Sequence, residues 1–232
     1  MGSRFHPREY PPKDIYVAEF EMAHAPVTVN QYAVFLNSGA SKQKKWWEPD
    51  GWAWLQEKSD GWGREDRTQP DRWKLQLQRP HHPVVGITWF EAQAYCAWVS
   101  DERKLNVSLP TEEQWERAAR GDDKRPFPWG EEFDREKTNT LEGGDEDTGL
   151  AASEAGDVSP FGVLGLGGNV QEWTTSEYTP LEDEARPSDI IRVARGGTFN
   201  DTAFGARTSY RRGYPPGYFY AFLGFRVVVG IK

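Results

Sequence analysis

The stretch LPTEEQWERAARG, residues 109–121, reads as a short helix whose two ends are both marked in the sequence. Thr111 is a suitable N-cap, and Gln114 follows it at the three-residue spacing of a capping box. Two acidic residues come directly after the cap, where the positive end of a helix dipole favours them, and Gly121 is a residue type that ends helices. The stretch therefore predicts a helix from Thr111 to Arg120.

The same capping pattern occurs twice upstream of this helix. Thr28 precedes a glutamine by three residues at the start of segment 28–37, and Thr88 precedes a glutamate by three residues at the start of segment 88–100. In the first of these segments the large apolar residues also fall on one helical face. Two further helices are predicted there.

Strands are predicted only as short pieces. Alternation, or enrichment in β-branched and aromatic residues, marks segments 15–20, 83–88, 190–194 and 225–229. Beyond Arg125 the chain shows almost no helical pattern, and 23 Gly, 16 Pro and 14% aromatic residues indicate many turns held by large rigid side chains. The expected fold class is α+β with little regular secondary structure.

Length and charge narrow the class of protein. With 232 residues the chain suits one good core and is short for two, so a single domain over residues 1–232 is expected. No apolar run approaches the roughly 20 residues that cross a bilayer, and the mean hydropathy is −0.78. A net charge of −8 disfavours nucleic acid, because phosphate binding requires clustered Lys and Arg. The charge favours a protein or small-molecule partner instead, and for the C-terminal face a protein or other macromolecular ligand is expected.

The sequence alone is compatible with more than one cellular compartment. The N-terminus lacks the basic and apolar stretches of a secretory signal, and with Cys96 alone no intrachain disulfide can form. A cytoplasmic location is the default expectation, and display on a cell surface or a virion is compatible with the same features.

A long segment rich in tryptophan, about 42–78, shows no sustained period and reads as an insertion. Two interpretations stay open for it: an aromatic cluster that binds a ligand, or loops that use indoles to fill a shallow core. The second is favoured, because loops of this length need large anchoring side chains.

Seven short motifs follow one another in a fixed order along nearly the whole chain outside that insertion. They lie within 26–32 (PVT, QY), 82–98 (HPVV, W, EA, AYC, W), 109–121 (LPTE, WE, AARG), 128–130 (PWG), 168–173 (GNV, EW), 195–197 (RGG) and 224–226 (GFR). In this order they resemble the sulfatase-modifying-factor, or formylglycine-generating-enzyme, family. The resemblance implies a C-type lectin-like α+β fold.

The resemblance also indicates a lost activity. In the enzymes of that family two cysteines after the RGG motif bind copper and oxidise a substrate cysteine to formylglycine; carried over by position, they fall on Asp201 and Ala206. Neither side chain supplies the thiolate that Cu(I) requires. Cys96 lies in a helical motif and is interpreted as a core residue, and the 4 histidines lack the triad spacing of the family's iron-dependent sulfoxide synthases. No catalytic residue is therefore expected.

Calcium is the one cofactor that the resemblance leaves open. Members of the family often bind Ca²⁺ through oxygen ligands around the GN motif. Glu172 keeps the family's carboxylate, whereas Gly165 replaces the usual side-chain oxygen, and Asn139 is a second candidate beside Asp145 or Asp147. We expect no cofactor, with calcium at Glu172 or Asn139 as the alternative.

The segment from Phe199 to Leu223, FNDTAFGARTSYRRGYPPGYFYAFL, uses a restricted alphabet. It contains no Lys, Glu, Gln, Trp or Met, where average composition would place about five or six. Each of its residue types can be reached from an asparagine codon by substituting adenines, and the five missing types cannot. The segment resembles the variable region, about 199–223 here, of diversity-generating retroelement variable proteins, whose folds display mutagenised residues on one face.

That second resemblance implies a set of ligand-contact residues. The set is Phe199, Asn200, Asp201, Thr202, Phe204, Gly205, Tyr210, Arg212, Gly213, Tyr214, Tyr218, Tyr220, Ala221 and Phe222. Antibody paratopes favour a similar alphabet, because Tyr gives a large contact area at low entropy cost. Three interpretations stay open: a binding module with a variable C-terminal face, an oxidoreductase of the same family using other residues, and a cysteine-less accessory paralogue with a fixed partner. The first is preferred.

Overall fold

The computed structural model describes residues 1–9, 11–56, 67, 69–144, 146–153, 156–180 and 190–230. Its helices are α1 (Val29–Asn37), α2 (Pro49–Gln56), α3 (Trp73–Gln76), α4 (Trp89–Arg103) and α5 (Glu112–Arg120), with short 3-10 turns η1 (Pro7–Glu9), η2 (Ala40–Lys42) and η3 (Lys44–Trp46). Its strands are β1 (Phe20–Met22), β2 (Val107–Ser108), β3 (Gln171–Glu177), β4 (Arg192–Arg195), β5 (Arg211–Tyr214), β6 (Leu223–Gly224) and β7 (Val228–Gly230).

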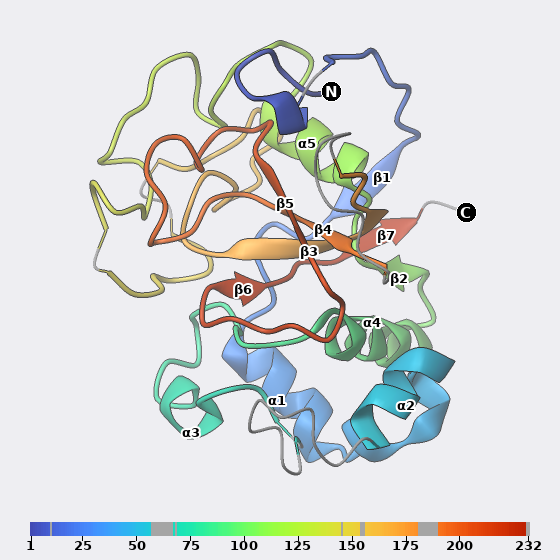
Figure 1. Cartoon of the computed structure of the whole chain (residues 1–232). Helices are drawn as coiled ribbons and strands as arrows, with labels where there is room; N and C mark the ends of the chain where they lie inside the picture. Colours follow the sequence, from blue (N-terminus) through green and yellow to red (C-terminus); the bar gives the residue numbers. More distant parts are fainter. Residues whose placement is uncertain are drawn as a thin grey trace.

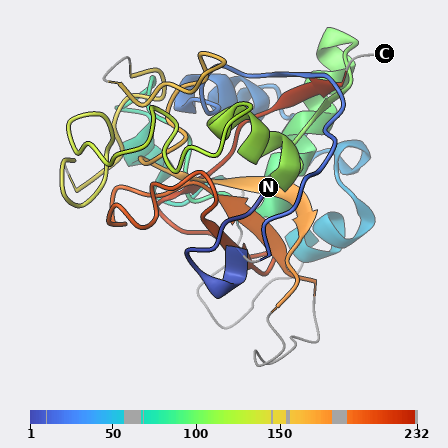
Figure 2. The same cartoon turned by 90° about the horizontal axis from the view of Figure 1, so that it is seen from above.

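The strands form two small sheets (Figure 1). One sheet has the strand order β1-β7-β2, and the other has the order β5-β4-β3-β6. Strands β3 and β6 run parallel, and the other neighbours run antiparallel. In Figure 1 helices α1 to α4 lie below the four-stranded sheet and α5 lies above it, and Figure 2 shows the loops between α5 and β3 gathered at one side.

All three helices predicted from capping patterns are present. Thr28, Thr88 and Thr111 each accept a hydrogen bond from the backbone N–H three residues on, and the side chain at that position bonds back to the cap. Helix α4 continues past its predicted end to Arg103 and stops at Lys104, whose φ of 54° is left-handed. None of the described helices combines the length and the apolar character needed to cross a membrane.

Two of the four predicted strands are wrong. Segment 83–88 makes one isolated bridge, between Thr28 and Pro83, because Gly86 turns the backbone to a φ of 66°. Segment 15–20 enters a sheet only at Phe20, where β1 begins its pairing with β7, and the residues before it lie mostly exposed. The other two predicted strands are confirmed with shifted bounds, segment 190–194 as β4 and the end of segment 225–229 as the start of β7.

The main core is aromatic and packs the four-stranded sheet against α1 and α4. Tyr32 of α1 stacks on Tyr95 of α4 with ring centroids 5.6 Å apart, and Tyr95 meets Phe225 edge to face at 5.3 Å. Trp173 of β3 is fully buried and donates its indole N–H to the carbonyl oxygen of Ile87 at 3.0 Å. Phe225 is fully buried and belongs to this core.

The tryptophan-rich segment is more regular than its sequence indicates, because it contains η3, α2 and α3. Its described indoles are buried or pack against the main core: Trp46, Trp47, Trp52, Trp54 and Trp73. Trp62 lies outside the described residues. For the described indoles, the structure therefore agrees with the interpretation that they fill a shallow core.

Asp157 is a buried carboxyl group with an incomplete set of partners. Its Oδ2 accepts a hydrogen bond from the N–H of Gly167 at 2.8 Å, whereas its Oδ1 is buried without a partner. Burial raises the pKa of Asp157 to about 7, compared with about 3.9 for an exposed aspartate. The folded protein therefore favours the protonated form of Asp157. The contribution of this group to the free energy of unfolding is present in full below about pH 4, the pKa of the unfolded state, and is lost as the pH rises through about 7.

We predict that Asp157→Asn stabilises the protein at pH 8 by about 2 kcal/mol, because asparagine keeps an acceptor and carries no charge. At pH 5 the gain should be smaller, because the folded protein holds the neutral acid there. Urea unfolding at the two pH values measures this difference. Asp122→Asn, at a side chain that is 82% exposed, is the control, and a gain at Asp157 that is equal at both pH values would contradict the prediction.

Candidate ligand-binding face

The segment 199–223 starts from an anchor made by Arg195 and the two glycines after it. Arg195 is fully buried; it donates to Oε2 of Glu116 at 2.6 Å and to two backbone carbonyl oxygens of the segment itself. Gly196 has a φ of 83°, and a Cβ there would lie 3.1 Å from the indole of Trp115. The RGG motif therefore serves close packing in this chain.

The segment ends at a second buried anchor. Arg226 donates to both carboxylate oxygens of Glu172 at 2.6 Å, and the side chains of both residues are 0% exposed. The indole N–H of Trp115 donates to the same carboxylate at 2.8 Å. The RGG and GFR motifs thus place a buried arginine at each end of the segment, which leaves the core and returns to it at fixed points.

The positions that carry cysteines in the family's enzymes have structural roles here. Oδ2 of Asp201 accepts hydrogen bonds from the backbone N–H and the hydroxyl of Thr198, and its Oδ1 accepts one from Arg212 at 3.2 Å. Ala206 is fully buried. At these two positions the chain has a carboxylate that is already hydrogen-bonded and a methyl group. Soft Cu(I) prefers thiolate ligands, which neither position supplies.

Aromatic rings follow one another along the segment. Phe204 meets Tyr210 edge to face at 5.6 Å, Tyr214 lies 5.5 Å from Tyr220, and Tyr220 stacks on Phe222 at 5.2 Å. The hydroxyl of Tyr214 also donates to the side-chain oxygen of Gln171 at 2.8 Å, which fixes the middle of the row. Neighbouring rings therefore hold one another in place.

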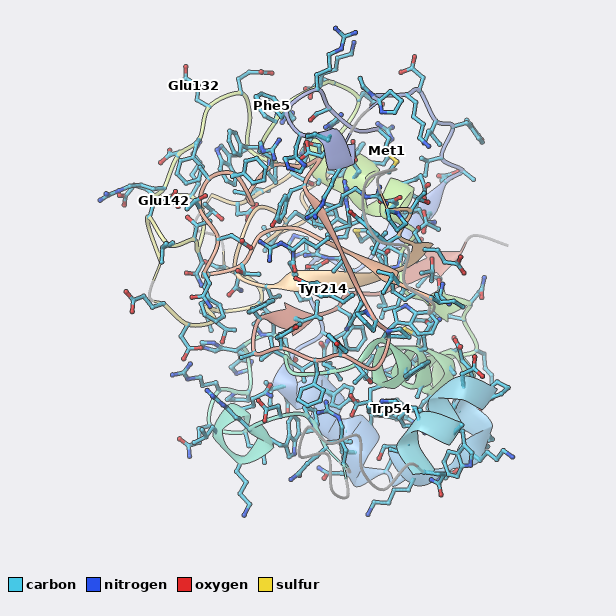
Figure 3. All side chains as sticks on the ribbon, viewed as in Figure 1. Met1, Phe5, Trp54, Glu132, Glu142 and Tyr214 are labelled. Atoms are coloured by element: carbon cyan, nitrogen blue, oxygen red, sulfur yellow. The ribbon has the colours of Figure 1, made fainter. Side chains whose placement is uncertain are left out.

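Three of the aromatic side chains point outward. Phe204 is 45% exposed, Tyr218 is 48% exposed and Tyr220 is 38% exposed. In Figure 3 the labelled Tyr214 lies between the labelled Phe5 at the N-terminal segment and the labelled Trp54 of α2. Trp54 also approaches the segment directly, because a Cβ at Gly217 would lie 2.6 Å from its indole nitrogen. The tryptophan-rich segment therefore adjoins this surface.

The predicted contact set is only partly exposed. Phe199 and Tyr210 are each 6% exposed, and Gly205 is buried as well, so the expectation that these residues face solvent is wrong. Tyr210 packs beneath Phe204, and burial raises the pKa of Tyr210 to about 12. The exposed members are Asn200, Thr202, Phe204, Tyr218, Tyr220 and Ala221, and the half-buried members are Asp201, Arg212, Gly213, Tyr214 and Phe222.

A pocket of about 390 Å³ opens at the first half of the segment. Members of the predicted set line it together with residues of the N-terminal segment and β5: Asn200, Asp201, Thr202, Phe204, Gly205, Tyr210 and Arg212, with His6, Arg8, Glu9 and Arg211. Half of the predicted contact residues thus meet at one concave site, whereas Tyr218 and Tyr220 belong to the surface beside it.

The N-terminal segment is the part of this site that sequence reasoning missed. The Glu9 carboxylate is buried and accepts hydrogen bonds from the two terminal nitrogens of Arg207 at 2.9 and 2.7 Å. The hydroxyl of Ser209 donates to it at 2.7 Å. Glu9 and Arg207 are 198 residues apart in the sequence, so no local pattern could have indicated the pair.

The two calcium candidates are separate groups with different surroundings. Both oxygens of Glu172 already accept hydrogen bonds from a guanidinium group, which would repel a cation, so Glu172 does not fit a calcium ion. Asn139 donates to the carbonyl oxygen of Asp147 at 2.8 Å, and its own Oδ1 is buried without a partner. Within the described ranges no group of three or more His, Cys, Asp or Glu is arranged to hold a metal ion.

The chain has a C-type lectin-like α+β fold with short strands and long loops. The solved structure of Treponema denticola variable protein 1 has this fold, with a TM-score of 0.72 at 16% identity over 98% of this chain and 90% of that chain. Residues 1–231 match the sulfatase-modifying factor enzyme 1-like domain family, and the chain belongs to that family.

Two curated relatives show how varied this family is. The chain is 32% identical over 257 residues to the inactive Cα-formylglycine-generating enzyme 2 of Bos taurus, covering 96% of this chain and 81% of that protein. It is 30% identical over 226 residues to hercynine oxygenase of Mycolicibacterium thermoresistibile, covering 88% of this chain. The chain spans 49% of the length of that oxygenase.

Proposed function

We propose that this chain is a non-catalytic ligand-binding protein whose contact surface is the exposed side of segment 199–223. One observation carries the proposal: Phe204, Tyr218 and Tyr220 stand 45%, 48% and 38% exposed on a segment fastened at both ends by buried arginines. Aromatic side chains on a rigid support bind partners well, because their burial releases much free energy and costs little conformational entropy. The partner is a protein or another macromolecule.

The residues at positions 201 and 206 support the absence of catalysis. Asp201 is engaged with Thr198 and Arg212, and Ala206 is buried, so neither residue can act as a redox thiol. The name of the bovine relative, an inactive enzyme, agrees with this reading. Because one relative is an oxygenase, the alternative is an oxidoreductase that uses other residues.

The restricted alphabet of segment 199–223 supports diversification of this face by adenine substitution. The likeness in fold to the Treponema denticola variable protein supports it further. Not every position could vary, because residues 206–209 are buried against the Glu9 and Arg195 clusters. Diversification would therefore concentrate at the exposed positions Asn200, Thr202, Phe204, Tyr218, Tyr220 and Ala221.

We predict that the protein neither converts a CxPxR peptide to the formylglycine product nor forms a stoichiometric Cu(I) complex. The one cysteine, Cys96, is buried, and burial raises its pKa well above the usual range, so it supplies no thiolate. Mass spectrometry of the peptide and copper titration of the protein measure the two properties. Cys96→Ser should behave like the wild type, and product formation by either protein would overturn the non-catalytic assignment.

A cysteine-less accessory paralogue with a fixed partner is the second candidate, and the 32% identity to the bovine inactive enzyme favours it. The DNA that flanks the gene separates the two candidates. A nearby template repeat that matches codons 199–223 and differs only at adenines supports diversification. If no such repeat exists, the fixed partner is the better reading of the same surface.

A further inference from the structure

The pocket beside Phe204 has an unusual balance of charge for so acidic a chain. Three arginines, Arg8, Arg211 and Arg212, line it with two carboxylates, Glu9 and Asp201. A further cation, Arg207, lies directly behind Glu9. Glu112, which does not line the pocket, accepts a hydrogen bond from Arg211 at 3.0 Å. The lining itself holds three arginines against two carboxylates, in a chain whose net charge is −8.

Both carboxylates of the pocket accept hydrogen bonds from the protein itself through each of their oxygens. Glu9 accepts from Arg207, Ser209 and Ser3, and its side chain is 1% exposed. Asp201 accepts from Thr198 through one oxygen and from Arg212 through the other. All four carboxylate oxygens therefore already accept hydrogen bonds from the protein, and the acids are poorer partners for a ligand than the arginines are.

The donors of the pocket are less fully used. The Arg212 side chain is 41% exposed, and a guanidinium group carries five N–H donors, more than its hydrogen bonds to Tyr210, Tyr214 and Asp201 require. The Nε–H of Arg211 is buried without a partner. Nδ1 of His6 accepts the backbone N–H of Arg8 at 3.2 Å, which leaves its other ring nitrogen as a donor. The site offers hydrogen-bond donors and positive charge.

The pocket wall that carries His6 and Arg8 is rigidly held. Glu9, directly after them, is fixed by Arg207 and Ser209, and the ring of His6 meets Phe204 edge to face at 5.6 Å. Arg211 donates to the carbonyl oxygen of Arg8 at 3.5 Å. The donors are thus positioned before any ligand arrives, which lowers the entropy cost of binding.

We propose that this pocket binds a carboxylate, supplied by a Glu or Asp side chain of a protein partner that docks on the aromatic face. A guanidinium fork matches the two oxygens of a carboxylate, and the aromatic rings of Phe204 and Tyr210 accommodate the apolar stem that carries it. This inference deepens the proposed function and rests on it. The arginine cluster selects the partner, and the aromatic rings supply contact area.

The test uses a labelled hexaglutamate peptide, with hexaglutamine as the neutral control, in fluorescence anisotropy at low ionic strength. The wild type should bind hexaglutamate and not hexaglutamine. Arg212→Gln and Arg8→Gln should each weaken hexaglutamate binding by about tenfold, which equals about 1.4 kcal/mol. Arg135→Gln, at an exposed arginine that does not line the pocket, should leave binding unchanged.

Five results would overturn the proposal: no binding to the wild type, equal binding of hexaglutamine, an equal loss with Arg135→Gln, inorganic phosphate competing more strongly than glutarate, or glutarate binding as tightly as the peptide. Glutarate should bind at least tenfold more weakly than the peptide, and equal affinities would point to a free acid in place of a protein partner. Arg8→Gln is the variant that should fold normally, because Arg8 is exposed, whereas Arg212 also donates a hydrogen bond to Tyr210. If hexaglutamate does not bind, the contacts of Tyr218 and Tyr220 with a partner are still to be measured. Failure of the carboxylate inference is therefore distinguishable from failure of the proposed function.

Discussion

Replacing Arg226 by methionine lowers the free energy of unfolding by about 3 to 5 kcal/mol. Arg226 donates two hydrogen bonds to Glu172 at 2.6 Å, and both side chains are fully buried. The substitution leaves Glu172 as a buried charge that, among the described residues, keeps only the indole N–H of Trp115 as a hydrogen-bond donor. Because this pair fixes the end of segment 199–223, the loss should appear in urea unfolding at pH 7 as a lower midpoint.

Arg79→Met is the matched control for this prediction. Arg79 pairs with Asp147 on the surface, where their side chains are 49% and 52% exposed, so its loss should change stability by less than about 1 kcal/mol. The double variant Glu172→Met with Arg226→Met should recover part of the loss, because no buried charge remains. Equal effects of the two single arginine substitutions would show that the buried pair does not anchor the segment.

The triple variant Phe204→Ala, Tyr218→Ala, Tyr220→Ala should lose at least about 100-fold in affinity for peptides selected against the wild type from a randomised display library. These three side chains are the large exposed hydrophobics among the described residues of segment 199–223. Contact energy concentrates in a few aromatic residues at binding surfaces, so most selected peptides should depend on them. Biolayer interferometry of each peptide against both proteins measures the change.

The control for the binding test is a second triple variant on other parts of the surface. Tyr16, Leu150 and Phe161 are 90%, 53% and 53% exposed and lie outside the segment, so their replacement by alanine should leave binding of most peptides unchanged. If the selected peptides are lost equally often with the two triple variants, exposure alone explains binding and the face has no special role.

The parts of the fold that depend on local chemistry could be predicted from the sequence. The caps at Thr28, Thr88 and Thr111 each act within one helical turn, and all three helices begin where the caps indicate. Strand prediction failed at 83–88 and for most of 15–20 because a strand needs a partner, which the sequence does not name.

In the candidate ligand-binding face, too, some features could be predicted from the sequence and others could not. The anchors Arg195 and Arg226 follow motifs that the sequence displays, and both are fully buried. The inward direction of Tyr210 could not be predicted, because a restricted alphabet says nothing about which side of a loop packs. The pairing of Glu9 with Arg207 joins opposite ends of the chain, so only the folded structure reveals that the N-terminal segment builds part of the pocket.

The melting curve of the Phe204, Tyr218 and Tyr220 triple variant, recorded beside that of Tyr210→Ala and paired with the binding measurement, tests the role of the face most directly. The triple variant should melt within about 3 °C of the wild type while its binding is lost, because exposed side chains support no core. Tyr210→Ala should melt roughly 5 °C lower or more, because Tyr210 is 6% exposed and its removal leaves a cavity. A triple variant that unfolds as readily as Tyr210→Ala would show that these aromatic residues belong to the core, and the ligand-binding face would be contradicted.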